Sequence, residues 1–278
     1  MRKIGIAVLF IYTATLAGIF AWADEAANKA DAVEAISIPV KIESKELRAY
    51  DVVVKMVGRA PGEDKEPPID IDATYALEIQ HQYGQREPDG TIPLEISASK
   101  AEATIGDQKL TILGTDFPKI TVLFDKSYKI TNVFGIPNAD SANQMLGLNY
   151  SNLIVLFFVP DGSQMHKVGE SWTSKVKIPG VKDEVAVVTT LNSIKDEGGI
   201  KTARIHQVWG WYAQESKDRT PVYNQFTIDS TFALNTGKLL KSHADTLIYT
   251  KDPAVFTQEQ QPYKINTKID ISPASKRG

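Results

Sequence analysis

The feature that most constrains this chain is an alternation of apolar and polar residues with a period of two. It is clearest in three stretches, 73–79, 92–98 and 226–234. Side chains with this period point to opposite faces of a strand, so one face can meet a core while the other meets water. Further candidate strands are 36–42, 49–57, 120–124, 172–178, 185–194, 201–212 and 238–249. The pattern predicts a mainly β protein with antiparallel strands.

Two related halves are predicted, about 46–135 and 169–251. A strand, a polar turn containing Gly and a second strand run from Leu77 to Ala98, and the same arrangement returns from Val185 to Trp211. Turn residues between the strands, such as Pro88-Asp89-Gly90, are typical of hairpins. Each half would form a meander with an apolar face that needs a partner. We therefore expect a curved antiparallel sheet, an open barrel or a clam-like arrangement.

The N-terminus has the pattern of an export signal. Basic residues at positions 2 and 3 precede an apolar run, and Ala21-Trp22-Ala23 is typical of a cleavage site. We predict a signal peptide over 1–23 and a spacer over 24–35, with an uncleaved membrane anchor as the alternative. No transmembrane segment is expected after cleavage. The predicted location is the periplasm or the extracellular medium.

Composition excludes several classes of protein. The chain has no cysteine, so disulfides, thiolate metal sites and a cysteine-linked lipid anchor are impossible. Its net charge is −3 at pH 7, which offers no broad basic surface for nucleic acid. There is no glycine-rich phosphate loop, and no cofactor is expected.

A connector over 136–168 joins the two halves and contains an unusual apolar run, Leu153–Val159. Helical spacing is predicted just before it, over 141–149. Seven consecutive apolar residues must avoid water, so the run is a buried plug, a movable lid over an apolar cavity or a membrane contact. After the second half, 252–278 is rich in Gln, Pro, Ser and Lys, and we expect a loose tail.

No pattern of residues predicts catalysis. Ser97 and Lys100 have the Ser-x-x-Lys spacing of penicillin-binding enzymes, but they lie on a predicted strand, where residues three apart point to opposite faces. No Gly-x-Ser-x-Gly elbow occurs. We therefore predict that the protein is not an enzyme and has no catalytic residues.

Metal binding is not predicted either. His243 and Asp245 share one strand face but lack a third ligand nearby in the sequence. The acidic loop 63–72 lacks the spacing of a calcium loop. His81 lies on the same face of its predicted strand as the apolar residues. We expect a hydrogen-bonded histidine near the rim of the core.

Aromatic and aliphatic clusters are the best candidates for a ligand-binding surface. Trp209 and Trp211 share one strand face and could stack on a sugar, line an apolar groove or fill the end of a barrel. With the connector they define the candidate ligand-binding residues: Trp209, Trp211, Leu153, Phe157 and Phe158.

The chain resembles a family of uncharacterised exported bacterial proteins. The resemblance lies in Val168-Gly169-Glu170-Ser171-Trp172, after Pro160, and in the hairpin from Phe232 to Leu239. At fold level the two-half β design is similar to the lipoprotein-carrier (Lol-type) clam, which holds acyl chains in an apolar concavity. That resemblance implies a ligand concavity but does not fix a function.

Two functions remain open from the sequence. The first is binding of an apolar ligand, a lipid or a lipoprotein in a β concavity. The second is a structural or envelope-assembly role, with a fully packed interior and another envelope protein as partner. A continuous apolar space of several hundred Å³ favours the first, and a filled interior favours the second.

Overall fold

The chain divides into two units, Met1–Glu34 and Ala35–Gly278, and the described residues all belong to the second. The computed structural model describes residues 35–38, 43, 45–60, 67–112, 117–126, 129–136, 156–177, 184–213, 222–250 and 264–274. The expected signal peptide, the expected helix at 141–149 and residues 24–34 of the expected spacer lie outside these residues, while Ala35, the last spacer residue, belongs to a strand. No helix in this part of the chain is long and apolar enough to span a membrane.

All regular structure in the described residues is β-strand. The strands are β1 (Ala35–Ile36), β2 (Leu47–Ala60), β3 (Ile69–Tyr83), β4 (Ile92–Ile105), β5 (Gln108–Ile112), β6 (Ile120–Phe124), β7 (Ile130–Phe134), β8 (His166–Lys167), β9 (Ser171–Val176), β10 (Val185–Glu197), β11 (Ile200–Ala213), β12 (Val222–Ala233), β13 (Lys238–Thr250) and β14 (Lys264–Pro273).

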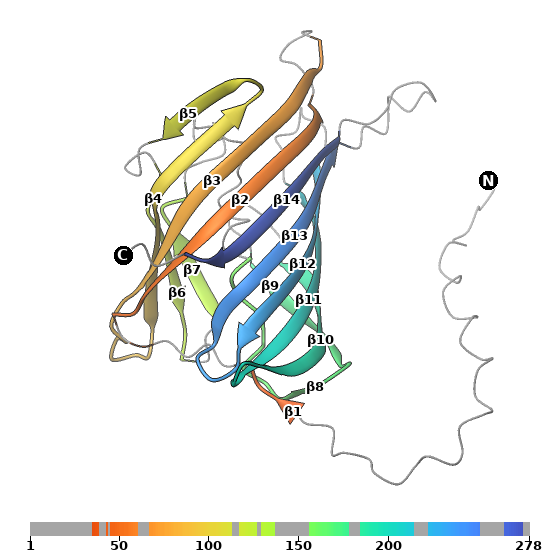
Figure 1. Ribbon diagram of the computed structural model, residues 1–278. Coiled ribbons are helices and arrows are strands. Elements are labelled where there is room, and N and C mark those ends of the chain that lie inside the picture. The colour runs from red at the N-terminus through yellow and green to blue at the C-terminus, as the bar shows by residue number, and fades with distance from the viewer. Residues whose placement is uncertain are drawn as a thin grey trace, which may run out of the picture. The chain divides into compact units, whose positions relative to one another are not determined.

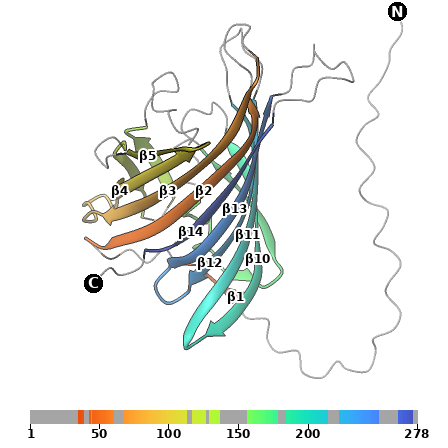
Figure 2. The same cartoon turned by 45° about the horizontal axis from the view of Figure 1, so that its top comes forward.

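Twelve of these strands form one antiparallel sheet in the order β7-β6-β4-β3-β2-β14-β13-β12-β11-β10-β9, with β5 also paired to β4. The sheet curves strongly, and Figures 1 and 2 show it turning from β4 and β5 round to β10. Strands β1 and β8 form a separate two-stranded pair. The prediction of a mainly β, curved antiparallel sheet or open barrel is confirmed.

The two meanders advance in the same direction along the sheet. From β2 to β7 the chain moves from the centre to one edge, and from β9 to β13 it moves from the other edge toward the centre. The hairpins β3–β4 and β10–β11 occupy equivalent places in the two runs. The close structural relation of the halves stays a prediction.

The alternation in the sequence reappears as alternating burial. In β3, every second side chain from Ala73 to Tyr83 is buried, and the residues between them are partly or fully exposed. Strands β6 and β14 follow the same rule, and β10 follows it from Val185 to Leu191. The buried set forms one apolar cluster on the inner face of the sheet, and burial of this kind is the main force that stabilises a fold.

The expectation of a loose tail is wrong for Lys264–Pro273. These residues form β14, which pairs with β13 on one side and with β2 on the other. It buries Ile269 and Ile271 on the inner face. The close approach of β14 to β2 requires Gly58, because a Cβ atom there would collide with the Lys264 carbonyl. The last strand of the chain therefore joins the two meanders into one sheet.

Candidate functional site

The described part of the apolar connector packs against the inner face of the sheet. Leu156, Phe157 and Val159 are buried, and Phe158 is partly buried against the same cluster. Residues 153–155, and with them the candidate residue Leu153, lie outside the described residues. For residues 156–159, the geometry is that of a segment inside the core.

Hydrogen bonds from the second half hold this segment by its backbone. Trp172 Nε1 donates to the carbonyl of Pro160 at 3.1 Å, and Ser174 Oγ donates to the same oxygen at 3.4 Å. Gln207 Nε2, whose side chain is buried, donates to the Phe158 carbonyl at 3.5 Å. Buried carbonyls need such partners because leaving them unpaired is costly. The segment is anchored by polar contacts as well as by apolar packing.

The motif Val168–Trp172 forms part of this anchor. Gly169 has a φ of +83°, which glycine adopts without strain, in the turn between β8 and β9. Glu170 Oε2 accepts a hydrogen bond from the Lys167 amide at 2.7 Å. The His166 and Trp172 rings stack with centroids 3.6 Å apart. In this structure the motif positions the tryptophan that holds Pro160.

Aromatic rings from the first half enclose the two phenylalanines. The Phe157 ring lies 4.9 Å from that of Tyr50 on β2 and 4.4 Å from that of His81 on β3, between centroids. The Phe158 ring lies 5.0 Å from that of Phe124 on β6. Tilted and edge-to-face pairs at these separations are favourable beyond the area they bury. The segment therefore contacts both halves of the sheet.

Three charged side chains, those of Glu46, Arg48 and Lys238, form a group beside these rings. Glu46, just before β2, accepts hydrogen bonds from Arg48 at 2.8 Å and forms an ion pair with Lys238 of β13 at 2.7 Å. The Arg48 guanidinium also lies 5.0 Å from the centroid of the Tyr83 ring. Burial alone would raise the pKa of Glu46, but the hydrogen bonds from Arg48 and Lys238 lower it to about 2. This group links the start of β2, in the first half, to the β12–β13 hairpin of the second half.

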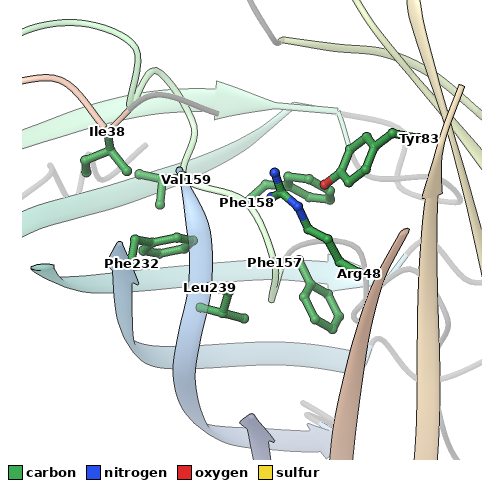
Figure 3. A pocket seen from close by; sticks show the side chains of 9 residues that line it. Ile38, Arg48, Tyr83, Phe157, Phe158, Val159, Phe232 and Leu239 are labelled. Atoms are coloured by element: carbon green, nitrogen blue, oxygen red, sulfur yellow. The ribbon is translucent and has the colours of Figure 1, made fainter. Parts of the chain in front are cut away.

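The pocket beside this group is very small. Figure 3 shows Arg48 and Tyr83 on one side of it, with Phe157 and Phe158 beside them. Its volume is about 10 Å³, room for roughly one water molecule. Pockets for small organic ligands are typically about 300–1,000 Å³. Its lining residues are Ile38, Arg48, Tyr83, Phe157, Phe158, Val159, Phe232, Gly237 and Leu239.

His81 is deeper in the core than the sequence suggested. It is 1% exposed, and its Nε2 atom has no hydrogen-bond partner among the described residues. The expectation of a hydrogen-bonded histidine at the rim is therefore wrong at this atom. Burial, with a smaller effect of nearby Arg48, lowers the pKa of His81 to about 3. The ring is neutral in the folded protein at ordinary pH.

The burial of the neutral His81 ring predicts that the folded protein loses stability in acid. The unfolded chain binds a proton at His81 near pH 6.5, and the folded protein does not until about pH 3. The stability that depends on neutral His81 is therefore present above pH 6.5 and is lost as the pH falls below it. Between pH 7 and pH 5 the loss should be about 2 kcal/mol. His81→Leu should remove it, as measured by urea denaturation of both proteins at the two pH values. An identical pH dependence in parent and variant would contradict the assignment.

The structure brings together only some of the predicted ligand-binding residues. Phe157 and Phe158 line the small pocket. Trp209 belongs to the same core but does not line the pocket; it is 2% exposed, and its Nε1 has no hydrogen-bond partner among the described residues. The Trp211 side chain lies outside what the structure describes. Glu46, Arg48 and Lys238 were not predicted from the sequence. The available signal was Arg48, a charged residue at a position of β2 that shares its face with the apolar residues of that strand.

The other candidates for chemistry lie on the outer side of the sheet. A bulge in β4, where its pairing with β3 shifts between Glu78 and Ile79, leaves Ser97 and Lys100 both outside the core, so the expectation of opposite faces is wrong. Lys100 pairs with Glu102 at 2.8 Å. His243 contacts Asp245 at 3.3 Å. No group of three His, Cys, Asp or Glu side chains among the described residues is arranged to hold a metal ion.

Comparisons with known proteins identify no family. No family model matches the chain, and no curated protein matches it. Among solved structures, DynF from the dynemicin biosynthesis pathway of Micromonospora chersina shares 9% identity at a TM-score of 0.23, over 91% of this chain and 92% of that one. The ywiB protein of Bacillus subtilis shares 10% identity at a TM-score of 0.15, over 82% and 94%.

Proposed function

We propose that this chain is an exported, non-enzymatic protein of the cell envelope that acts through its outer surface, with a packed interior. The observation that carries the proposal is the packing of residues 156–159 against the inner face of the sheet, within the part of the chain that the structure describes. Residues 156–159 occupy the inner face, and the pocket beside them has a volume of about 10 Å³. An acyl chain needs far more room than one water molecule. The proposal takes the second of the two functions that the sequence left open.

The anchoring of the segment supports the same proposal. A lid must release its contacts at low cost when a ligand enters, and such elements make few buried contacts. Here Trp172, Ser174 and Gln207 bind the backbone at Pro160 and Phe158. Opening would leave the buried Ser174 and Gln207 side chains without these partners, at a cost of about 1–3 kcal/mol for each.

Binding of a lipid or lipoprotein is the second candidate function. The observation that favours it is the apolar inner face with Phe158, only partly buried, beside the Arg48 guanidinium. If Phe157 and Phe158 moved away, Tyr50, His81 and Phe124 would be uncovered. An apolar chain with an anionic head would match that composition.

A titration with sodium oleate, monitored by tryptophan fluorescence, separates the two functions. Trp209 is buried in the inner face, so displacement of the segment should alter its emission. We expect no saturable change below the concentration at which oleate forms micelles. A saturable change, lost in a variant with Phe158→Ala, would favour the lipid-binding function.

The surface role needs a positive test as well. A photo-crosslinking residue in place of Val208, which is 37% exposed on the outer face of β11, should give a discrete adduct in the native host. The same residue in place of Phe134, 51% exposed on β7, samples the sheet edge. If neither position yields an adduct with another envelope protein, the proposed surface role is contradicted.

A further inference from the structure

The outer face of the second half carries an alternating row of histidine and aspartate. His206 on β11 is opposite Asp229 on β12, Asp229 is opposite His243 on β13, and His243 is opposite Asp270 on β14. The row therefore crosses four neighbouring strands. It ends on β14, the strand that joins the two meanders.

The His243 ring lies between two carboxylates. Its Nδ1 lies 2.7 Å from Asp270 Oδ1, and its Nε2 lies 3.3 Å from Asp245 Oδ2. A neutral imidazole has one N–H and can donate to one of these carboxylates, while an imidazolium donates to both. Carboxylates beside both ring nitrogens therefore favour the protonated ring. His206 makes a single contact of this kind, 2.9 Å from Nδ1 to Asp229 Oδ1.

We infer that His243 is a proton-dependent clamp between β13 and β14 on the outer face of the sheet. With the proton bound, the ring bridges Asp245 on its own strand and Asp270 on the next. Without the proton, the ring keeps one N–H that can still donate to Asp270, but this donor is no longer charged, and the contact with Asp245 loses its donor. The clamp tightens in mild acid and loosens in alkali, at the seam where the two halves meet.

The charges around the ring favour the proton. Asp229 faces it from β12, and Asp270 faces it from β14. Asp245 and Lys241 flank it on β13, and Lys268 lies diagonally across on β14. The three carboxylates outweigh the two lysines. The hydrogen bond to Asp270, followed by the charges of Asp270 and Asp245, raises the pKa of His243.

The direction of the effect follows from this raised pKa. A group that binds its proton more tightly when folded stabilises the fold fully below its unfolded pKa, near 6.5, and loses that contribution as the pH rises above it. His81 acts in the opposite direction, because its folded pKa is lowered. Variants of the two residues therefore change opposite sides of the stability profile.

An NMR titration of the histidine rings in the full chain tests the clamp. The chain has four histidines, so His243→Gln identifies the signal of His243. We expect this signal to titrate above pH 6.5 in the parent. Asp270→Asn should move its midpoint down by at least half a pH unit, while Asp107→Asn, in the β4–β5 turn, should leave it in place. A midpoint at or below 6.5, or a midpoint unaffected by Asp270→Asn, would overturn the proposal.

Amide hydrogen exchange reports the clamp itself. After correction for intrinsic rates, amides of 242–248 should exchange at least twofold faster at pH 8 than at pH 6 in the parent. That difference should vanish in Asp270→Asn, which keeps His243 but removes the charge that faces it. Equal protection in the parent at both pH values would show that the proton does not control the seam.

Discussion

Replacing Phe157 with Ala is expected to lower the free energy of unfolding by about 3–5 kcal/mol, the range for removal of a buried phenylalanine. The side chain is 5% exposed and contacts rings from β2 and β3. Its loss would leave a cavity between the connector and both strands, and the surrounding backbone is held by hydrogen bonds. Denaturation by urea, monitored by circular dichroism, gives the measurement.

Phe134 provides the matched control. It lies on the edge strand β7 and is 51% exposed. Phe134→Ala should change the free energy of unfolding by about 0.5 kcal/mol or less, as is usual for exposed positions. If Phe157→Ala costs as little as Phe134→Ala, residues 156–159 are not part of the core, and the movable-lid interpretation is restored.

Replacing Glu46 with Gln should cost about 3 kcal/mol at pH 7. The carboxylate is 10% exposed and holds Arg48, whose side chain is 6% exposed. Removing one member of a buried ion pair leaves the other charge without compensation, which typically costs about 3–5 kcal/mol. A pKa lowered from 4.5 to about 2 corresponds to a similar free energy. The measurement is urea denaturation at pH 7.

The cost of Glu46→Gln should also depend on pH in a defined direction. Because the folded pKa is lowered, the contribution of Glu46 is present above about pH 4.5 and is lost as the pH falls toward 2. Parent and variant should therefore converge in stability near pH 2. Glu95→Gln is the control, since its pair with Lys119 is exposed and should contribute under about 1 kcal/mol. A cost that stays constant down to pH 2 would rule out the charged pair as its cause.

The strands could be predicted from sequence because one face of each strand is buried. In β3, the alternation from Ala73 to Ile79 is the direct record of that burial. Strand β14 was not predicted from its alternation. Thr267, Ile269 and Ile271 alternate correctly and are buried, but the surrounding tail is rich in Gln, Pro, Ser and Lys. The polar composition of the whole tail therefore conceals the alternation of buried and exposed residues within β14.

The site was less predictable because it depends on register. Glu46 and Lys238 meet only when β14 enters the sheet and brings the β12–β13 hairpin near the start of β2. The bulge that puts Ser97 and Lys100 on the same side of β4 likewise leaves no mark in the sequence. Phe157 and Phe158 could be predicted to avoid water, but the polar contacts at Phe158 and Pro160 that hold them required the structure.

The most direct test of the packed interior is the lipid content of the protein purified from its native host without detergent. Organic extraction and mass spectrometry would quantify any lipid or fatty acid relative to protein. Because the pocket at Arg48 and Phe158 has a volume of only about 10 Å³, we predict far less than one acyl chain per protein molecule. About one mole of a defined lipid per mole of protein, retained through purification, would contradict the packed interior and establish the chain as a lipid-binding protein.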